Sequence, residues 1–302
     1  MHAAYVRVPA STSNLGAGFD CIGLALDRYL TAEFRPGPGT SLTIVRRGTV
    51  RVLDDRPAAH DLFVTAFRST LAARGHRDVG GTLIIDSEIP VARGLGSSAV
   101  AVVGGTALGM AAAGDAIDNA RILADAERAE GHLDNAAPAL LGGLVAVAHG
   151  HPFALPLSPN LAFVFAAPGV ELATARARAA LPATVPHAEA TRALSRVAAL
   201  IRALETGDPE LLVLGLDDTL HVPYRLPLIP GGAEVVAAGK KAGAYGVTVS
   251  GAGSGLLAIT PPARADDVAA AMAAAFRLAA GPEGVMAFEV RPDREGTAIR
   301  DP

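Results

Sequence analysis

The order of apolar and polar positions along the chain predicts strands and helices in alternation. Short apolar runs bounded by turn residues predict strands at 5–8, 21–34, 42–52 (as a β pair), 82–85, 142–147, 161–166, 247–250, 256–260 and 285–290. Apolar residues at helical spacing predict helices at 60–74, 99–113, 115–130, 173–181, 187–204, 232–242 and 264–278. Strand pairs alternating with helices predict an α+β fold built in layers.

A polar, turn-rich segment divides this pattern in two. The run His149-Gly150-His151-Pro152 interrupts the apolar periodicity near the middle of the chain. Half of the 302 residues are apolar, and a chain of this length forms one large domain or two smaller ones. We therefore expect two domains, covering residues 1–150 and 151–302.

The segment between the strand at 82–85 and the helix at 99–113 is rich in glycine and serine. Glycines let the backbone turn tightly and approach a ligand, and the start of a helix offers unpaired N–H groups to an anion. The segment therefore predicts a phosphate-binding loop. Its candidate contacts are Pro90, Val91, Ala92, Arg93, Gly94, Leu95, Gly96, Ser97, Ser98, Ala99 and Val100.

Three other interpretations of this loop are weaker. A Walker loop needs a lysine, and the only lysines are Lys240 and Lys241. The run from Gly94 to Ala99 matches the dinucleotide fingerprint, but eight residues separate it from Ile85 and no acidic residue follows at a strand end, so a dehydrogenase is disfavoured. A serine hydrolase is excluded because the chain has no G-x-S-x-G motif.

Three motifs together resemble the GHMP small-molecule kinases. They are the phosphate loop, the run from Pro9 to Asp20 (PASTSNLGAGFD) and the run from Val249 to Gly255 (VSGAGSG). The run from Pro9 to Asp20 is most similar to the homoserine kinase branch. So is a further run, from Glu130 to Pro138 (EGHLDNAAP). The resemblance implies a ribosomal-protein-like N-terminal domain, a ferredoxin-like C-terminal domain, and an active site between them.

The resemblance also implies an ATP-dependent kinase that uses Mg²⁺. It places the metal at Ser98 and Glu130, and hard oxygen ligands of this kind suit Mg²⁺. It places the turn from Val249 to Gly255 against the phosphate loop. It implies Asp61 near the adenine, where asparagine is usual in the family, and the extra carboxylate puts that nucleotide contact in question.

For the acceptor, the resemblance implies L-homoserine and a role in threonine biosynthesis. The substrate contacts that it implies are Asn14, Asp20, His132, Arg178 and Arg225. A guanidinium can grip a planar carboxylate through two hydrogen bonds, which suits an amino-acid substrate. Asp134 matches a catalytic aspartate of mevalonate kinases, although the homoserine branch implies no general base, and Asn135 is the alternative group to orient the hydroxyl.

Composition narrows the remaining classes. The net charge of −4, without a basic run, argues against a nucleic-acid partner, and no apolar stretch is long enough for a membrane span. The single cysteine and the absence of a signal-peptide pattern indicate a cytoplasmic protein. The resemblance allows a homodimer. Two alternatives stay open: a GHMP kinase for mevalonate, a sugar or shikimate, and a non-catalytic nucleotide-binding sensor.

Overall fold

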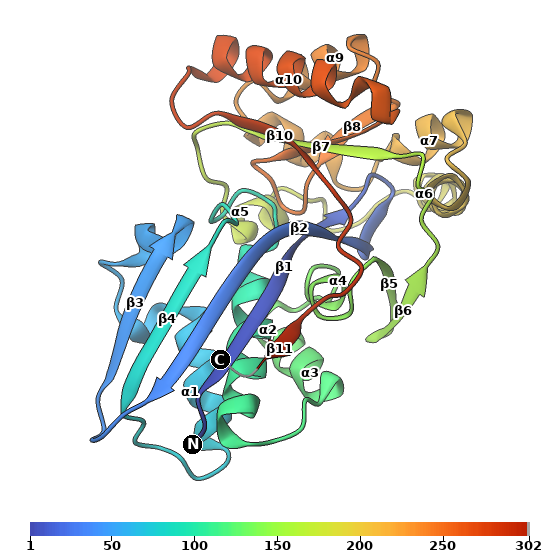
Figure 1. Ribbon diagram of the computed structural model, residues 1–302. Coiled ribbons are helices and arrows are strands. Elements are labelled where there is room, and N and C mark those ends of the chain that lie inside the picture. The colour runs from blue at the N-terminus through green and yellow to red at the C-terminus, as the bar shows by residue number, and fades with distance from the viewer. Residues whose placement is uncertain (301–302) are drawn as a thin grey trace.

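The computed structural model describes residues 1–300, which form two β-sheets, one in each half of the molecule (Figure 1). The first sheet has the strand order β11-β1-β2-β4-β3, and the β5–β6 hairpin joins it through β2. Its strands are β1 (Ala4–Asn14), β2 (Gly18–Pro36), β3 (Leu42–Gly48), β4 (Gly81–Ser87), β5 (Leu144–Ala148), β6 (His151–Leu155) and β11 (Ala298–Arg300). The long β2 links the β1, β4 and β5 parts of this sheet.

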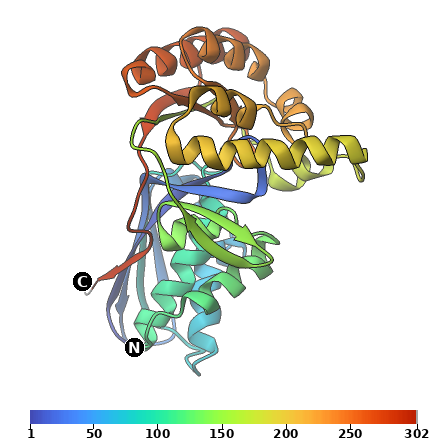
Figure 2. The same ribbon diagram turned by 90° about the vertical axis from the view of Figure 1, so that its right-hand side faces the viewer.

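Four helices accompany this sheet: α1 (Leu62–Ala72), α2 (Ser97–Ala113), α3 (Asn119–Glu130) and α4 (Ala136–Leu141). The first three lie on one face of the sheet (Figures 1 and 2). Asp61 and Asp118 accept hydrogen bonds from the first turns of α1 and α3, which fixes where these helices begin. Twelve of the seventeen residues of α2 are buried, so this helix is the centre of the N-terminal core.

The second sheet is formed by β7 (Ala162–Ala167), β8 (Gly246–Val249), β9 (Leu256–Thr260) and β10 (Met286–Val290). All neighbours are antiparallel and the order is β10-β7-β9-β8, which is the strand order of a ferredoxin-like fold. Helices α9 (Gly232–Lys241) and α10 (Ala265–Ala280) pack together on this sheet (Figure 1). The connection from β7 to α9 carries α5 (Thr174–Ala179), α6 (His187–Thr206), α7 (Pro209–Leu216) and α8 (Val222–Arg225).

The mixed fold of two α+β layers is confirmed, but the predicted β pair at 42–52 is wrong. Only β3 forms, and it runs parallel to β4. After Gly48, which has a φ of 61°, the chain leaves the sheet as a 3-10 helix, Thr49–Leu53. The Thr49 hydroxyl donates to the Ser87 and Ile89 carbonyls and holds the turn beside the end of β4. The end of β3 is therefore fixed by a contact between Thr49 and backbone carbonyls about 40 residues away in the sequence.

The segment predicted as a domain boundary is a hairpin turn. Residues 149–150 join β5 to β6, and both strands belong to the first sheet. The chain passes to the second sheet between Leu155 and Ala162, and β11 then returns to pair with β1. A domain division at residue 150 stays a prediction. The passage from the first sheet to the second lies a few residues later, between β6 and β7.

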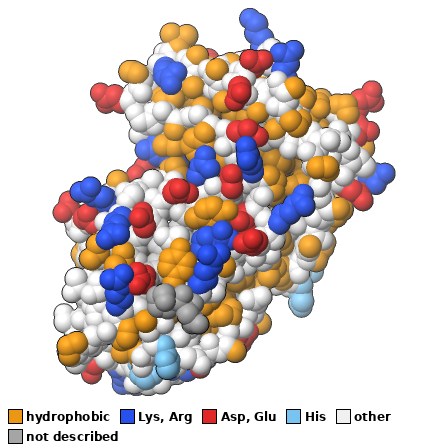
Figure 3. Space-filling model, viewed as in Figure 1, with side chains coloured by type: hydrophobic (Ala, Val, Ile, Leu, Met, Phe, Trp, Pro, Cys, Tyr) orange, Lys and Arg blue, Asp and Glu red, His pale blue; other side chains and the backbone are white. Residues whose placement is uncertain are grey.

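The surface mixes both signs of charge. Acidic and basic side chains are interspersed over the face seen in Figure 3, with apolar side chains between them. Within residues 1–300, no helix combines the length and the apolar character that crossing a membrane requires.

Candidate active site

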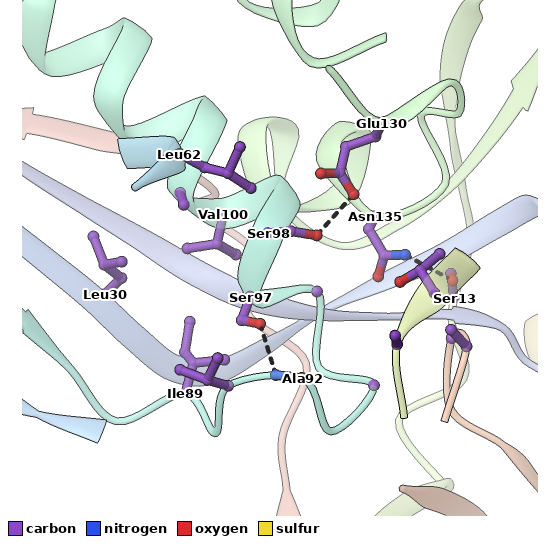
Figure 4. Close-up of a pocket in the computed structure, with 18 of the residues that line it drawn as sticks. Ser13, Leu30, Leu62, Ile89, Ala92, Ser97, Ser98, Val100, Glu130 and Asn135 are labelled. Carbon is purple, nitrogen blue, oxygen red and sulfur yellow. Dashed lines mark hydrogen bonds between the residues drawn. The ribbon is translucent and has the colours of Figure 1, made fainter. Parts of the chain in front are cut away.

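A cavity of about 270 Å³ lies where the two halves of the molecule meet. The N-terminal half contributes the ends of β1 and β4, the loop before α2 and the loop before α4. The C-terminal half contributes α5, Arg225 at the end of α8, and the turn between β8 and β9. In Figure 4, apolar side chains surround one end of the cavity and polar side chains the other, with the start of α2 between them.

The phosphate loop ends at a helix start that has no side-chain cap. Gly96 is the N-cap of α2, with a φ of 67°, and the first intrahelical hydrogen bond runs from Val100 N to Gly96 O. The amides of the first turn therefore remain available to an anion. Ser97 Oγ accepts a hydrogen bond from Ala92 N at 3.3 Å, which closes the loop (Figure 4).

The glycine turn between β8 and β9 packs directly against this loop, as the resemblance implies. Ser250 Oγ donates to Gly94 O at 2.7 Å, and Gly255 N donates to Arg93 O at 3.0 Å. A Cβ atom at Gly94 would overlap the Ser250 carbonyl oxygen, so the two backbones approach too closely for any side chain. The C-terminal half thus holds the loop in place.

Not every predicted loop residue faces the cavity. The cavity is lined by Val91, Ala92, Gly94, Gly96, Ser97, Ser98 and Val100, whereas Pro90, Arg93, Leu95 and Ala99 are not part of its wall. The Arg93 guanidinium donates to the Pro168 and Gly169 carbonyls instead. The Arg93 side chain therefore ties the loop to the start of the C-terminal half, and a phosphate contact by the backbone of the loop at this residue stays a prediction.

The structure places Ser98 and Glu130, the two residues predicted to hold Mg²⁺, next to each other. Ser98 Oγ donates to Glu130 Oε2 at 2.7 Å, at the cavity wall beside the first turn of α2 (Figure 4). Among the described residues, no group of three or more His, Cys, Asp or Glu side chains could hold a metal. Two hard oxygens next to a phosphate loop fit Mg²⁺, because this ion commonly takes its other ligands from phosphate and water.

Asp20 and the two predicted arginines meet in the same cavity. Arg178 on α5 donates to both Asp20 oxygens, at 2.8 and 3.0 Å. Arg225 is only 2% exposed; its Nη1 donates to Gly251 O at 3.0 Å, and its Nε has no partner among the described residues. Burial lowers the pKa of Arg225, because the charged guanidinium has lost its hydration. An anion that binds there would therefore pair with a positive charge that neither water nor the protein fully neutralises.

His132, Asp134 and Asn135 belong to one buried polar network. His132 Nδ1 is hydrogen-bonded to Asp134, which is 2% exposed. Burial alone would raise the pKa of Asp134, but the hydrogen bond and charge of His132 lower it below its usual value. Asn135 Nδ2 donates to Ser13 Oγ at 2.9 Å, and its Oδ1 accepts from Ser11 Oγ at 3.1 Å.

Asn14 and Asp61 line the cavity, but internal contacts hold their side chains. Asn14 Nδ2 donates to Gly251 O at 2.8 Å and Oδ1 accepts from Asp20 N at 3.0 Å, so Asn14 fixes Asp20 in place. Asp61 pairs with Arg46 as well as capping α1. A role of either residue in ligand binding stays a prediction.

Sequence reasoning missed several supporting residues. Ser11 and Ser13, in the run from Pro9 to Asp20, belong to the polar network of the site. Their sequence signal is a row of four polar residues, Ser11 to Asn14, which the structure buries at the end of β1. The Phe19 ring stacks on His221 at 5.1 Å and lies under the Arg225 guanidinium at 5.0 Å. These contacts join segments about 200 residues apart, and no local pattern reveals them.

The fold and this site define the GHMP kinase class. A family model of the GHMP kinases N terminal domain matches residues 61–143, and a model of the GHMP kinases C terminal domain matches residues 200–278. These models span the phosphate loop with Ser98 and Glu130, and the C-terminal segment from α6 to α10 that carries Arg225.

Individual relatives show which branch of the GHMP kinases the chain belongs to. The chain is 43% identical to homoserine kinases of Gloeobacter violaceus and Moorella thermoacetica, in each case covering 90% of this chain and 92% of the relative. The crystal structure of homoserine kinase from Cytophaga hutchinsonii superposes with a TM-score of 0.86 at 26% identity, over 99% of this chain and 98% of that one. The chain belongs to the homoserine kinase family.

Proposed function

We propose that this protein transfers the γ-phosphoryl group of ATP to the hydroxyl of L-homoserine, giving O-phospho-L-homoserine and ADP in threonine biosynthesis. The observation that carries the proposal is the placement of Asp20, Arg178 and Arg225 around one cavity beside a phosphate loop. One anionic and two cationic side chains complement an amino acid, which carries an ammonium and a carboxylate. We further propose a cytoplasmic location, where ATP and free amino acids are both available.

The nucleotide half of the site rests on the start of α2. The uncapped amides of the first turn and the helix dipole suit the triphosphate. Ser98 and Glu130 would hold Mg²⁺. The ion, when bound, neutralises charge on the transferred phosphoryl group. Phosphoryl transfer depends mainly on positioning and charge neutralisation, so these groups supply most of what the reaction needs.

The acceptor half rests on an exchange of ion pairs. Without ligand, Arg178 and Asp20 neutralise each other through two hydrogen bonds. An entering zwitterion offers each of them a new partner: its ammonium pairs with Asp20, and its carboxylate pairs with Arg178 and the buried Arg225. One ion pair is exchanged for three, which favours a zwitterionic acceptor over a neutral sugar or a simple hydroxy acid.

An acceptor panel tests this assignment. With Mg²⁺ present, L-homoserine should release ADP with a kcat/KM roughly 100-fold or more above that for mevalonate, galactose or shikimate, because these acceptors lack the ammonium that pairs with Asp20. L-serine carries both charges, but its hydroxyl is one methylene closer to them and falls short of the phosphoryl group, so it should also react far more slowly. Activity should vanish with a chelator and return with added Mg²⁺. A better rate with mevalonate or a sugar would leave the family intact and refute the acceptor. No turnover with any acceptor, alongside normal ATP binding, would favour the sensor alternative.

The role of Asp134 is tested by Asp134→Asn. We expect the KM for homoserine to rise while kcat changes less than about tenfold. The lowered pKa makes this carboxylate a weak proton acceptor, and its hydrogen bonds hold His132 and Ser13 toward the acceptor. A general base would instead cost about 10² to 10⁴ in kcat.

Steady-state kinetics over pH 5 to 9 separates the two roles of Asp134. The matched control is Asp125→Asn, which removes a carboxylate paired with Arg121 and Arg128 on α3, outside the cavity. A collapse of kcat at unchanged homoserine KM in Asp134→Asn, absent from the control, would establish Asp134 as the base.

A further inference from the structure

The end of the cavity away from Asp20 and the arginines is an apolar slot. Its walls are formed by Leu30, Val50, Leu53, Leu62, Ile89 and Val100. Figure 4 shows Leu30, Leu62, Ile89 and Val100 around this end, on the far side of Ser97 from Asn135. Aliphatic side chains from β2, α1, α2 and the loops beside them suit a flat heteroaromatic ring.

Two charged side chains interrupt these apolar walls. Arg46 on β3 is 6% exposed and Asp61 before α1 is 5% exposed, and both line the cavity. Arg46 Nε and Nη2 donate to Asp61 Oδ2 at 3.0 and 2.7 Å. Asp61 Oδ1 accepts from Val64 N at 3.2 Å. A buried ion pair contributes little to stability compared with apolar residues of the same shape, so its presence in an apolar slot calls for another reason.

The pair keeps unused hydrogen-bonding capacity. Within residues 1–300, Arg46 Nη1 makes no hydrogen bond, and the carboxylate oxygen paired with it, on the half-exposed Asp54, is 3.8 Å away. Asp61 Oδ1 accepts one hydrogen bond and can accept a second. The two residues therefore offer a donor and an acceptor side by side, which is what the amide of a single asparagine offers.

We propose that Arg46 and Asp61 together select adenine in this slot. Arg46 Nη1 donates to a ring nitrogen of the base, and Asp61 Oδ1 accepts from the exocyclic amino group beside it. Adenine presents such an acceptor and donor on one edge, whereas guanine presents two acceptors on the corresponding edge and would place its carbonyl oxygen against the Asp61 carboxylate. The inference rests on the proposed function only in placing a nucleotide in this cavity.

Calorimetric titrations with nucleoside diphosphates, without any acceptor, test the proposal. The wild-type protein should bind ADP roughly tenfold or more tightly than GDP, and severalfold more tightly than purine riboside diphosphate, which lacks the amino group. Because no acceptor is present, the outcome does not depend on whether homoserine is the substrate.

The informative variant is the double substitution Arg46→Met with Asp61→Ser. Arg46→Met alone leaves a buried carboxylate unpaired and destabilises the fold, whereas serine at position 61 still caps α1 without presenting the donor and acceptor of an amide. We expect the double variant to melt as a folded protein, and the preference for ADP over GDP to fall to about threefold or less. The control is Arg47→Met, the next residue on β3, which is exposed and outside the cavity wall.

Two results would overturn the proposal. One is a wild-type protein that binds GDP as tightly as ADP. The other is a folded double variant that keeps the full preference for ADP, which would place base selection in the apolar walls. Failure of the homoserine assignment would appear only in the acceptor panel and would leave both results interpretable.

Discussion

Valine in place of Gly96 will abolish nucleotide binding, with a loss of at least about 100-fold in ADP affinity. Gly96 has a φ of 67°, a region that β-branched residues resist. A Cβ atom there would overlap Ser11 Oγ and lie 3.0 Å from Asn135 Oδ1. The start of α2 must then move away from β1, and the uncapped amides lose the direction that a phosphate needs.

Thermal melts with and without ATP measure this loss, together with ADP titrations. A ligand at 100 times its Kd stabilises the folded protein by about 2.7 kcal/mol, and this increment should disappear in Gly96→Val. The control is Gly75→Val, because Gly75 has a φ of 87° and its Cβ would contact nothing within 4 Å. The control bears a similar backbone strain outside the site. If Gly96→Val keeps the full increment, the loop is not part of the nucleotide site.

Arg225→Met will raise the KM for homoserine by a large factor at nearly unchanged ADP affinity. Arg225 is buried, its guanidinium covers the Phe19 ring, and its Nε has no partner. Losing a charged contact of this kind costs about 2 to 5 kcal/mol, or a factor of roughly 30 to several thousand. Most of that cost comes from leaving the substrate carboxylate without its partner.

Arg178→Met gives a useful comparison for the same measurement. It removes a carboxylate partner but also frees Asp20 from its ion pair, so the ammonium of the substrate gains access to Asp20 as the carboxylate loses a contact. We expect a smaller rise in KM than for Arg225→Met. Arg176→Met, on the exposed face of α5, serves as the control. Equal weakening of ATP and homoserine binding would place the arginine on the triphosphate instead.

Local sequence signals were sufficient for much of the fold. The glycine–serine loop and the apolar helix after it predicted the start of α2 to within two residues. The helices that sequence reasoning missed are short: α4 and α8 span one or two turns, and α7 has eight residues. Helices of this length are marginal on their own and depend on tertiary packing, so their periodicity carries little signal.

The site divides in a similar way between local and distant signals. Asp20, Arg178, Arg225, Ser98 and Glu130 were assigned from motifs, and the structure brings all five to one cavity. Arg46 could not be assigned to the site, because it stands on a short strand outside every motif. Its place in the cavity wall depends on its ion pair with Asp61, which only the folded chain forms. The direction of the Arg93 side chain could not be predicted either, because Pro168 and Gly169 lie within reach of its guanidinium only in the folded chain.

The return of β11 to the first sheet affects how the protein is made. Residues 298–300 pair with Arg7, Val6 and Tyr5, and Tyr29 reaches back to Asp293 with a hydrogen bond of 2.9 Å. During synthesis at about 5 to 20 residues per second, the first six strands emerge roughly 7 to 30 seconds before β11. Throughout that interval β1 is an open edge that can pair with another nascent chain. The first sheet is therefore complete only after the C-terminal half has been synthesised. We expect the partly synthesised chain to be the state of this enzyme that aggregates most readily.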